Sequence, residues 1–136
     1  DGIRDSVASR GLGDVYKRQL ITNLPVEDLQ RAINFYTKLG LKYLDNAPKG
    51  LAFFDCGNAT QLILYERGRT KADHTAAVFQ VDDIETIVEQ LRSQDIKFLR
   101  YDDINKNSDI VTDDTGNKIA WFNDSEGNIL GLIQTR

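Results

Sequence analysis

Hydrophobic positions along the chain follow two different spacings, and these spacings predict its elements. Apolar runs of strand length occupy residues 20–26, 41–44, 51–56 and 60–66, with turn-forming residues between the later runs. Between the first two runs, apolar residues recur every three or four positions, which predicts an amphipathic helix. The expected buried face of this helix consists of Leu29, Ala32, Ile33, Tyr36 and Leu39.

The sequence also marks where these elements begin and end. Asp28 precedes the helix that starts near Leu29, and its side chain is of the type that accepts hydrogen bonds from free helical N–H groups. Gly40 is the residue type that commonly ends a helix. Because proline cannot donate to a sheet ladder, we expect the first strand to stop at Pro25. The result is one β-α-β-β-β unit over residues 20–66.

The second part of the chain, residues 74–136, repeats this unit. Strands are expected at 74–81, 96–99, 118–122 and 128–134, and Asp83 is placed to cap a helix whose apolar face consists of Ile84, Ile87, Val88 and Leu91. When the halves are aligned, Val26 matches Val81 and Phe54 matches Phe122. A tandem repeat of this kind predicts an α+β fold in which two βαβββ modules form a curved mixed sheet around a central cleft. The cleft is the expected functional site.

Composition and charge narrow the expected partners. The chain has 136 residues, so we expect a single domain, at residues 20–136. Its formal net charge is −4 and no dense Lys/Arg cluster is present, so nucleic acid is not an expected partner. We find neither an apolar run of membrane-spanning length nor a signal segment, and we therefore expect a cytoplasmic protein with no membrane partner. Cys56 is the only cysteine, which excludes an intramolecular disulfide.

Residues 1–19 differ from the rest of the chain. They show neither the helical nor the alternating spacing, and Gly2, Gly11 and Gly13 interrupt them. We interpret residues 1–19 as a non-native or disordered N-terminal segment and leave them out of the fold prediction. A genuine flexible arm is the alternative interpretation.

Three segments, in this order, resemble a known family. They are PVEDLQRAINFYTKLGLKYL at residues 25–44, VFQVDDIETIVEQL at 78–91 and WFNDSEGNILGLIQ at 121–134. On the duplicated frame they resemble the vicinal oxygen chelate superfamily, which contains glyoxalases, bleomycin-resistance proteins and extradiol dioxygenases. The resemblance covers essentially the whole domain. It implies the tandem βαβββ fold around a cleft, and it implies a homodimer.

The resemblance also identifies four positions that matter for chemistry. Enzymes of that superfamily bind one divalent metal through His, Glu or Gln side chains on the first and last strand of each unit. The matching positions here are Ile21, Ile63, Ala76 and Gly131. None of these residues has the imidazole nitrogen or the carboxylate or amide oxygen that such an ion requires. We therefore expect no metal and no cofactor, which argues against metal-dependent lyase or dioxygenase activity.

A cleft without metal ligands is expected to be mainly apolar, and such a cleft suits a small organic molecule. Strand alternation predicts its lining, which also includes Ile21, Val78 and Ile133. We predict no catalytic residue, and the function predicted first is metal-independent binding or sequestration of the bleomycin-resistance kind. The residues predicted to bind the ligand are Asn23, Gln61, Ile63, Tyr65, His74, Ala76, Trp121 and Gly131.

Two other functions stay open. The first is a glyoxalase-like or dioxygenase-like enzyme with a nonstandard divalent-metal site near His74, the only histidine, with Gln61 as a second ligand. Bound metal would distinguish it from a simple binder. The second is a dimeric interaction module without a ligand, which would show a closed cleft and no stabilisation by small molecules.

A long polar stretch, from Arg100 to Lys118, is inserted in the second unit. Loops of this length often act as lids or binding loops, and the acidic residues here would favour a cationic or polar ligand. The stretch also shows the alternating spacing of a calcium loop, but Ser108 stands where the sharp turn needs glycine, so we prefer a solvated polar loop. The polar residues 124–128 are predicted to form a hairpin turn rather than a ligand site.

Overall fold

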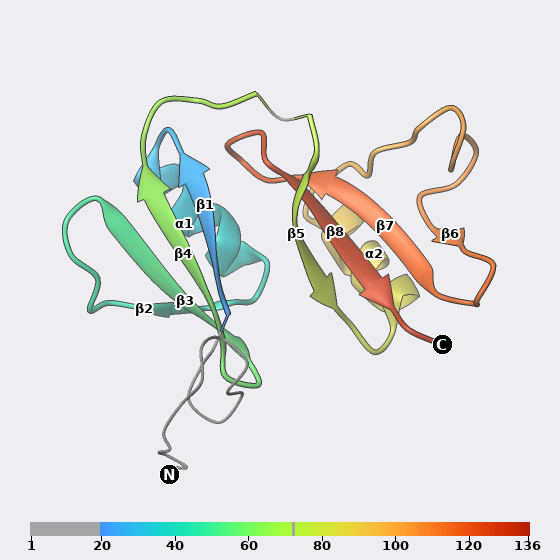
Figure 1. The fold of residues 1–136 in the computed structure, drawn as a ribbon, viewed down its shortest axis with the longest axis horizontal. Helices are drawn as coiled ribbons and strands as arrows, with labels where there is room; N and C mark the ends of the chain where they lie inside the picture. The colour runs from blue at the N-terminus through green and yellow to red at the C-terminus, as the bar shows by residue number, and fades with distance from the viewer. Residues whose placement is uncertain (1–19, 72) are drawn as a thin grey trace, which may run out of the picture.

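The computed structural model describes residues 20–71 and 73–136, so the prediction for residues 1–19 lies outside the described residues. These residues form two four-stranded mixed sheets, each with one helix (Figure 1). The first module contains β1 (Ile21–Val26), α1 (Leu29–Lys38), β2 (Lys42–Leu44), β3 (Leu51–Gly57) and β4 (Thr60–Glu66). The second contains β5 (Thr75–Gln80), α2 (Ile84–Ser93), β6 (Val111–Thr112), β7 (Lys118–Asn123) and β8 (Ile129–Gln134). The predicted fold of two tandem βαβββ modules is confirmed.

Strand order is the same in the two sheets, β1-β4-β3-β2 and β5-β8-β7-β6. In each sheet the first strand pairs in parallel with the last, and the other neighbours are antiparallel. β1 and β5 are therefore edge strands, and they border the gap between the two sheets (Figure 1). The gap between the modules thus has a sheet edge on each side.

The end of the first strand differs from the prediction. β1 continues past Pro25 to Val26, and Pro25 pairs with Tyr65 of β4. This is possible because an edge strand hydrogen-bonds to a neighbour on one side only, so the missing N–H group of proline can face away from the sheet. The rule that proline ends a strand applies to central strands, and β1 is not one of them.

The predicted strand at residues 96–99 is wrong in part. It is reduced to an isolated bridge between Phe98 and Phe122. The Leu99 carbonyl accepts a hydrogen bond from the Asn105 side chain at 3.0 Å, so it is engaged by the loop that follows. The outer strand of this sheet is instead β6, which comes from within the inserted stretch and pairs with β7.

Both helices begin at the predicted caps. The Asp28 carboxylate accepts a hydrogen bond from the Arg31 N–H group at 3.0 Å, and Asp83 accepts one from the Thr86 N–H group at 3.2 Å. Gly40 follows α1 with a φ of 99°, a conformation that glycine adopts without strain. No helix in the described part of the chain is long and apolar enough to cross a membrane.

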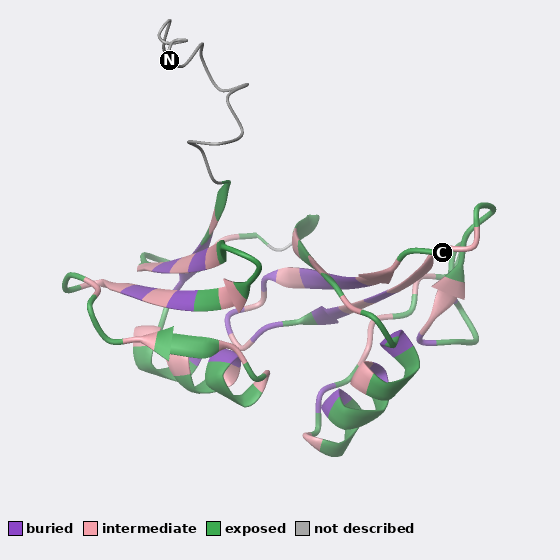
Figure 2. Cartoon of the chain, turned by 90° about the horizontal axis from the view of Figure 1, so that it is seen from below, coloured by how far each residue is buried: buried purple, intermediate pink, exposed green. Residues whose placement is uncertain are grey.

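One face of each sheet is buried beneath its helix. The helices contribute Ala32 and Tyr36 from α1 and Ile84, Val88 and Leu91 from α2. Figure 2 shows both helices on the same side of the two sheets. The sheets bury alternate residues against them, namely Leu24, Val26, Ala52, Phe54, Leu62, Leu64, Ala120, Phe122, Leu130 and Leu132.

The other face of both sheets has no helix over it, and we name it the uncovered face. Its residues alternate with the core residues along the strands, so their side chains lie on the opposite side. Val78 is 54% exposed and Ile21 is 37% exposed on this side. The uncovered face is defined by Ile21, Asn23, Ile63, Tyr65, Ala76, Val78, Trp121 and Ile133.

A hairpin turn of the second module binds the start of α1 and joins the modules. Glu126, in the turn between β7 and β8, is only 4% exposed. Its carboxylate accepts hydrogen bonds from the N–H groups of Glu27 and Asp28 at 3.0 and 2.9 Å. Arg31 donates to the same carboxylate through Nε at 2.7 Å and Nη2 at 2.9 Å. We name these contacts, with those of Asp124 and Asn128 described next, the inter-module joint.

Two further residues of the turn complete the joint. Asp124 accepts hydrogen bonds from the N–H groups of Glu126 and Asn128, both at 2.8 Å, which fixes the turn. Its other oxygen accepts a hydrogen bond from the buried Tyr36 hydroxyl at 2.5 Å. Burial, together with the Asp124 charge, raises the pKa of Tyr36 well above its ordinary value, so the hydroxyl keeps its proton. Asn128 donates to the Pro25 carbonyl at 2.9 Å.

Electrostatics favour the ionised form of Glu126. The hydrogen bond from Arg31 is the largest cause that lowers the pKa of Glu126, to about 2, and the bonds from the backbone and Ser125 act in the same direction against the effect of burial. The N-terminus of α1 also carries a partial positive charge, which stabilises a nearby anion. The joint is therefore an ionic contact between the modules in which the Glu126 carboxylate is buried and the Arg31 side chain stays partly exposed.

We expect Glu126→Gln to destabilise the protein by about 1–3 kcal/mol, because the charge-assisted bonds to α1 and Arg31 are lost. Chemical unfolding at pH 7 measures this. Glu89→Gln is the control, since Glu89 is exposed and its pairing with Arg92 at 3.1 Å is worth at most about 1 kcal/mol. The stabilisation by Glu126 is complete above its ordinary pKa of 4.5 and is lost as the pH falls toward its folded pKa of about 2. The difference in the free energy of unfolding between the wild type and Glu126→Gln should therefore shrink over that pH range. Equal stability of the two proteins at pH 7 would contradict the proposed weight of the joint.

Candidate functional site

The predicted ligand-binding residues lie in two regions, the uncovered face and the gap between the modules. On the first sheet, Asn23 and Ile63 are Cα partners on β1 and β4. On the second sheet, Trp121 and Gly131 are Cα partners on β7 and β8. The structure brings each pair together within its own sheet. It does not bring all eight residues around one enclosed cleft.

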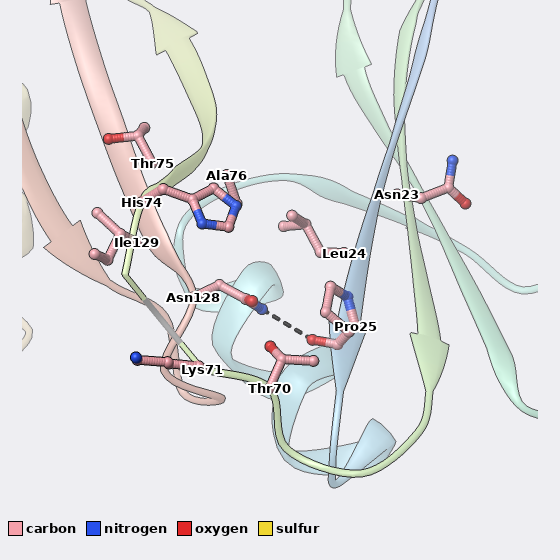
Figure 3. A pocket seen from close by; sticks show the side chains of 10 residues that line it. All are labelled: Asn23, Leu24, Pro25, Thr70, Lys71, His74, Thr75, Ala76, Asn128 and Ile129. Atoms are coloured by element: carbon pink, nitrogen blue, oxygen red, sulfur yellow. Dashed lines mark hydrogen bonds between the residues drawn. The ribbon is translucent and has the colours of Figure 1, made fainter.

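A pocket of about 320 Å³ lies between β1 and β5, and we name it the inter-module pocket (Figure 3). It brings together three of the predicted residues, Asn23, His74 and Ala76. Its volume is near the lower limit for sites that bind small molecules. The other residues that line it come from β1, the linker between the modules, β5, the turn before β8 and β8 itself, namely Leu24, Pro25, Thr70, Lys71, Thr75, Asn128 and Ile129.

The polar part of this pocket was not predicted from the sequence. Thr70 and Lys71 belong to the linker, where no strand alternation exists to predict which way a side chain points. Asn128 was assigned to a hairpin turn, and it does serve that turn, but its amide also reaches the Pro25 carbonyl across the modules. One feature of the sequence could have pointed to Thr70 and Lys71: the linker must cross from β4 to β5, so its residues lie beside the gap.

A second hollow, of about 390 Å³, lies farther along the same two edge strands. Its lining includes the predicted residues Gln61 and Val78, together with Thr22 of β1 and Cys56 of β3. Burial raises the pKa of the Cys56 thiol, which disfavours the thiolate that a nucleophilic cysteine needs. The gap between the modules therefore holds two hollows with different linings.

The surface around Gly131 is formed by its neighbours. A Cβ atom added at Gly131 would lie 3.2 Å from Cγ2 of Val78 and 3.7 Å from Cγ2 of Thr75. These two side chains therefore lie against the buried glycine. At this point of the uncovered face, Val78 is the group that a ligand would meet first, and the role of Gly131 in binding stays a prediction.

The inserted stretch reaches the uncovered face at Trp121. The rings of Tyr101 and Trp121 meet edge to face, with centroids 5.5 Å apart. Asn105 is buried and holds the start of the loop, accepting a hydrogen bond from the Tyr101 N–H group at 2.8 Å. Trp121, which is predicted to bind the ligand, is thus partly covered by a residue of the chain itself.

Asp109 fixes the middle of this loop. Its carboxylate accepts hydrogen bonds from Nε of Arg92 and Nε of Arg100, each at 2.9 Å. Burial alone would raise the pKa of Asp109, but the bonds from the two arginines outweigh it and lower the pKa. Asn105 and Asp109, two residues of the calcium-like spacing, are therefore engaged in holding the loop to the protein.

The four positions that the family uses for metal do not fit a metal ion here. Ile21, Ile63, Ala76 and Gly131 carry no donor atom in their side chains. Within residues 20–71 and 73–136, no group of three or more His, Cys, Asp or Glu residues is arranged to hold an ion. His74 is exposed, and its Nδ1 lies 2.9 Å from the Asp73 carboxylate.

The match to a known family agrees with the fold. Residues 18–121 match the family described as the Glyoxalase/Bleomycin resistance protein/Dioxygenase superfamily. The chain belongs to this superfamily. The resemblance drawn from the sequence is confirmed, including its connection to glyoxalases and bleomycin-resistance proteins. A comparison with curated proteins found no match.

Solved structures of superfamily proteins share the fold at low sequence identity. A bleomycin resistance determinant encoded on the transposon Tn5 is 20% identical with a TM-score of 0.69, over 88% of this chain and 99% of its own. TnmS3, an antibiotic binding protein from Streptomyces sp. CB03234, is 19% identical with a TM-score of 0.68, over 88% and 97%. Lactoylglutathione lyase from Agrobacterium tumefaciens is 20% identical with a TM-score of 0.67, over 87% and 93%. At these identities the likeness establishes the fold, which a resistance determinant, an antibiotic binding protein and a lyase share.

We expect Asp109→Asn to loosen the inserted loop, because a neutral amide holds the two arginines less strongly than a carboxylate does. Amide hydrogen exchange between Leu99 and Ile110 should accelerate by about tenfold. The fluorescence of Trp121 should shift as Tyr101 withdraws from it. Asp103→Asn, at an exposed position of the same loop, serves as the control. Unchanged exchange in Asp109→Asn would show that the loop is held by other contacts.

Proposed function

We propose that this superfamily member binds a small organic molecule without a metal ion and without transforming it. The ligand lies on the uncovered face and reaches the gap between the modules. The observation that carries the proposal is that Ile21, Ile63, Ala76 and Gly131 occupy all four metal positions of the family. An apolar surface replaces the metal centre, and apolar concave surfaces with a few polar groups suit organic ligands.

The aromatic groups of the uncovered face support this proposal. Tyr65 lies on β4, and Phe53 is the Cα partner of Ile63 on the neighbouring strand β3. Trp121 is half-buried on the second sheet. Aromatic rings contribute large contact areas and preferred stacking geometries, so they discriminate among planar apolar ligands. The binder TnmS3 and the bleomycin resistance determinant give the proposal a precedent within the fold.

We also propose that a second copy of the chain closes the site. In one chain, the uncovered face leaves Ile21 and Val78 exposed, and contiguous apolar surface of this kind usually marks an interaction site. Sedimentation should therefore give twice the mass of one chain. A dimer that binds none of the ligands tested would favour the alternative of an interaction module.

Ligand binding is measured through the single tryptophan, because its fluorescence reports on Trp121 alone. Titration with bleomycin and with neutral naphthalene derivatives should give saturable quenching by at least one of these compounds, with a Kd of about 1–100 μM. Tyr65→Ala should weaken binding by about tenfold through the loss of ring contact.

Tyr43→Ala is the matched control for the ligand titration. Tyr43 packs against Phe54 with ring centroids 5.5 Å apart, so it belongs to the helix-covered side. The Tyr43→Ala variant should leave the Kd unchanged, and circular dichroism checks that this variant is folded. The proposal is wrong if no compound gives saturable quenching, or if the two tyrosine variants lose affinity equally.

One observation favours the alternative of a metal-dependent enzyme. The Asp73 carboxylate contacts Nδ1 of His74 at 2.9 Å, and such a contact often orients a histidine that binds metal through its other nitrogen. Our proposal predicts less than about a tenth of an equivalent of Zn²⁺, Mn²⁺ or Ni²⁺ after equilibration and gel filtration, with no rise in thermal stability. Near-stoichiometric metal in the wild type that is lost in His74→Ala would establish the alternative instead.

A further inference from the structure

The inter-module pocket has a distinctive charge character. Of the ten residues that line it, the ionisable ones are Lys71 and His74, and no carboxylate is among them. The lining therefore offers a basic group to a ligand and no acidic one. A pocket of this kind discriminates among ligands by the sign of their charge.

Two acidic residues near the linker, Asp73 and Glu27, already have partners. Asp73 contacts His74, and Glu27 lies 3.5 Å from Nε of Arg69 and 3.8 Å from Nη2 of Arg31. Within the described part of the chain, no carboxylate lies within 4.0 Å of Nζ of Lys71. Among the described residues the ammonium group of Lys71 thus has no acidic partner, and Figure 3 shows the side chain at the rim of the hollow, directed away from Thr70.

The walls of the pocket combine an apolar side with a polar end. Leu24, Ala76 and Ile129 contribute apolar side chains. At the polar end, Figure 3 shows the Thr70 hydroxyl directed toward Asn128 and the Pro25 carbonyl. Asn128 is held in place by its bonds to Pro25 and Asp124, both at 2.9 Å, so this end of the pocket is preformed.

We propose that the inter-module pocket binds the carboxylate of a small organic acid. The apolar body of the acid packs against Leu24 and Ala76. Its carboxylate accepts a hydrogen bond from the Thr70 hydroxyl and, once the exposed Lys71 side chain turns toward the pocket, one from the Lys71 ammonium. The inference rests on the proposed function and specifies the ligand class, since Asn23 and Ala76 belong to both the pocket and the uncovered face. The linker would then select the ligand by charge, while the sheet faces select it by shape.

The test uses three isosteric probes that differ in charge, namely benzoate, benzamide and benzamidine. Nuclear magnetic resonance titration of the full chain follows the amides of Thr70, Ala76 and Ile129. Benzoate should shift these signals saturably, with a Kd on the order of 1 mM, as befits so small a ligand. Benzamide should bind about fivefold more weakly, and benzamidine more weakly still.

Lys71→Gln keeps the length of the side chain and removes its charge. It should weaken benzoate binding by about fivefold and leave benzamide binding unchanged. Lys106→Gln, at an exposed position in the inserted loop, is the matched control and should change neither. Equal affinity for the three probes would overturn the selection of acids, and equal effects of Lys71→Gln and Lys106→Gln would overturn the role of Lys71.

The two proposals fail separately. If none of the probes shifts the pocket amides while other compounds still quench Trp121, the inference about the pocket is wrong and the proposed function stands. If benzoate shifts the pocket amides as expected but no compound is bound on the uncovered face, the pocket is a site of its own. The wider binding function would then be wrong.

Discussion

The contact between Glu126 and the start of α1 holds the two modules in place. Each sheet and its helix can be formed from its own half of the chain, but the described hydrogen bonds of Glu126, Asp124 and Asn128 link the halves to one another. A nearly buried carboxylate is costly unless it is fully hydrogen-bonded, and here the backbone of α1 and the guanidinium group of Arg31 supply the donors. The width of the gap between β1 and β5, and with it both hollows, follows from where this turn docks.

Much of the fold could be predicted because its determinants are local. Apolar spacing identified α1 and α2, and Asp28 and Asp83 cap them as expected. Alternation along β4 and β8 correctly separated the buried side of each sheet from the other side. The strand predicted at residues 96–99 was reduced to a bridge because a side-chain hydrogen bond from Asn105 competes for the Leu99 carbonyl, and such a contact leaves no periodic signal.

The candidate site was predictable on the strands and at His74, directly before β5. Asn23 and Ala76 could be placed by alternation, and both line the inter-module pocket. The linker residue Lys71 could not be placed, since a segment without regular structure takes its orientation from contacts made elsewhere. The pairing of Arg31 with Glu126 also could not be predicted from the sequence, because residues so far apart in the chain approach each other only once both modules are folded.

The inter-module joint also has a consequence for how the chain folds. The bonds from Glu27 and Asp28 to Glu126 close loops of 99 and 98 residues, whereas the strand pairs of each sheet close loops about half as long or shorter. Because the entropy lost on closing a loop grows with its length, the separate sheets are favoured to form before the joint. A chain arrested at that stage would hold two folded modules that are free to turn about the linker. Nothing in either module alone would prevent the turn of one molecule from docking on α1 of another, so at high concentration the joint is the point at which two chains would exchange modules.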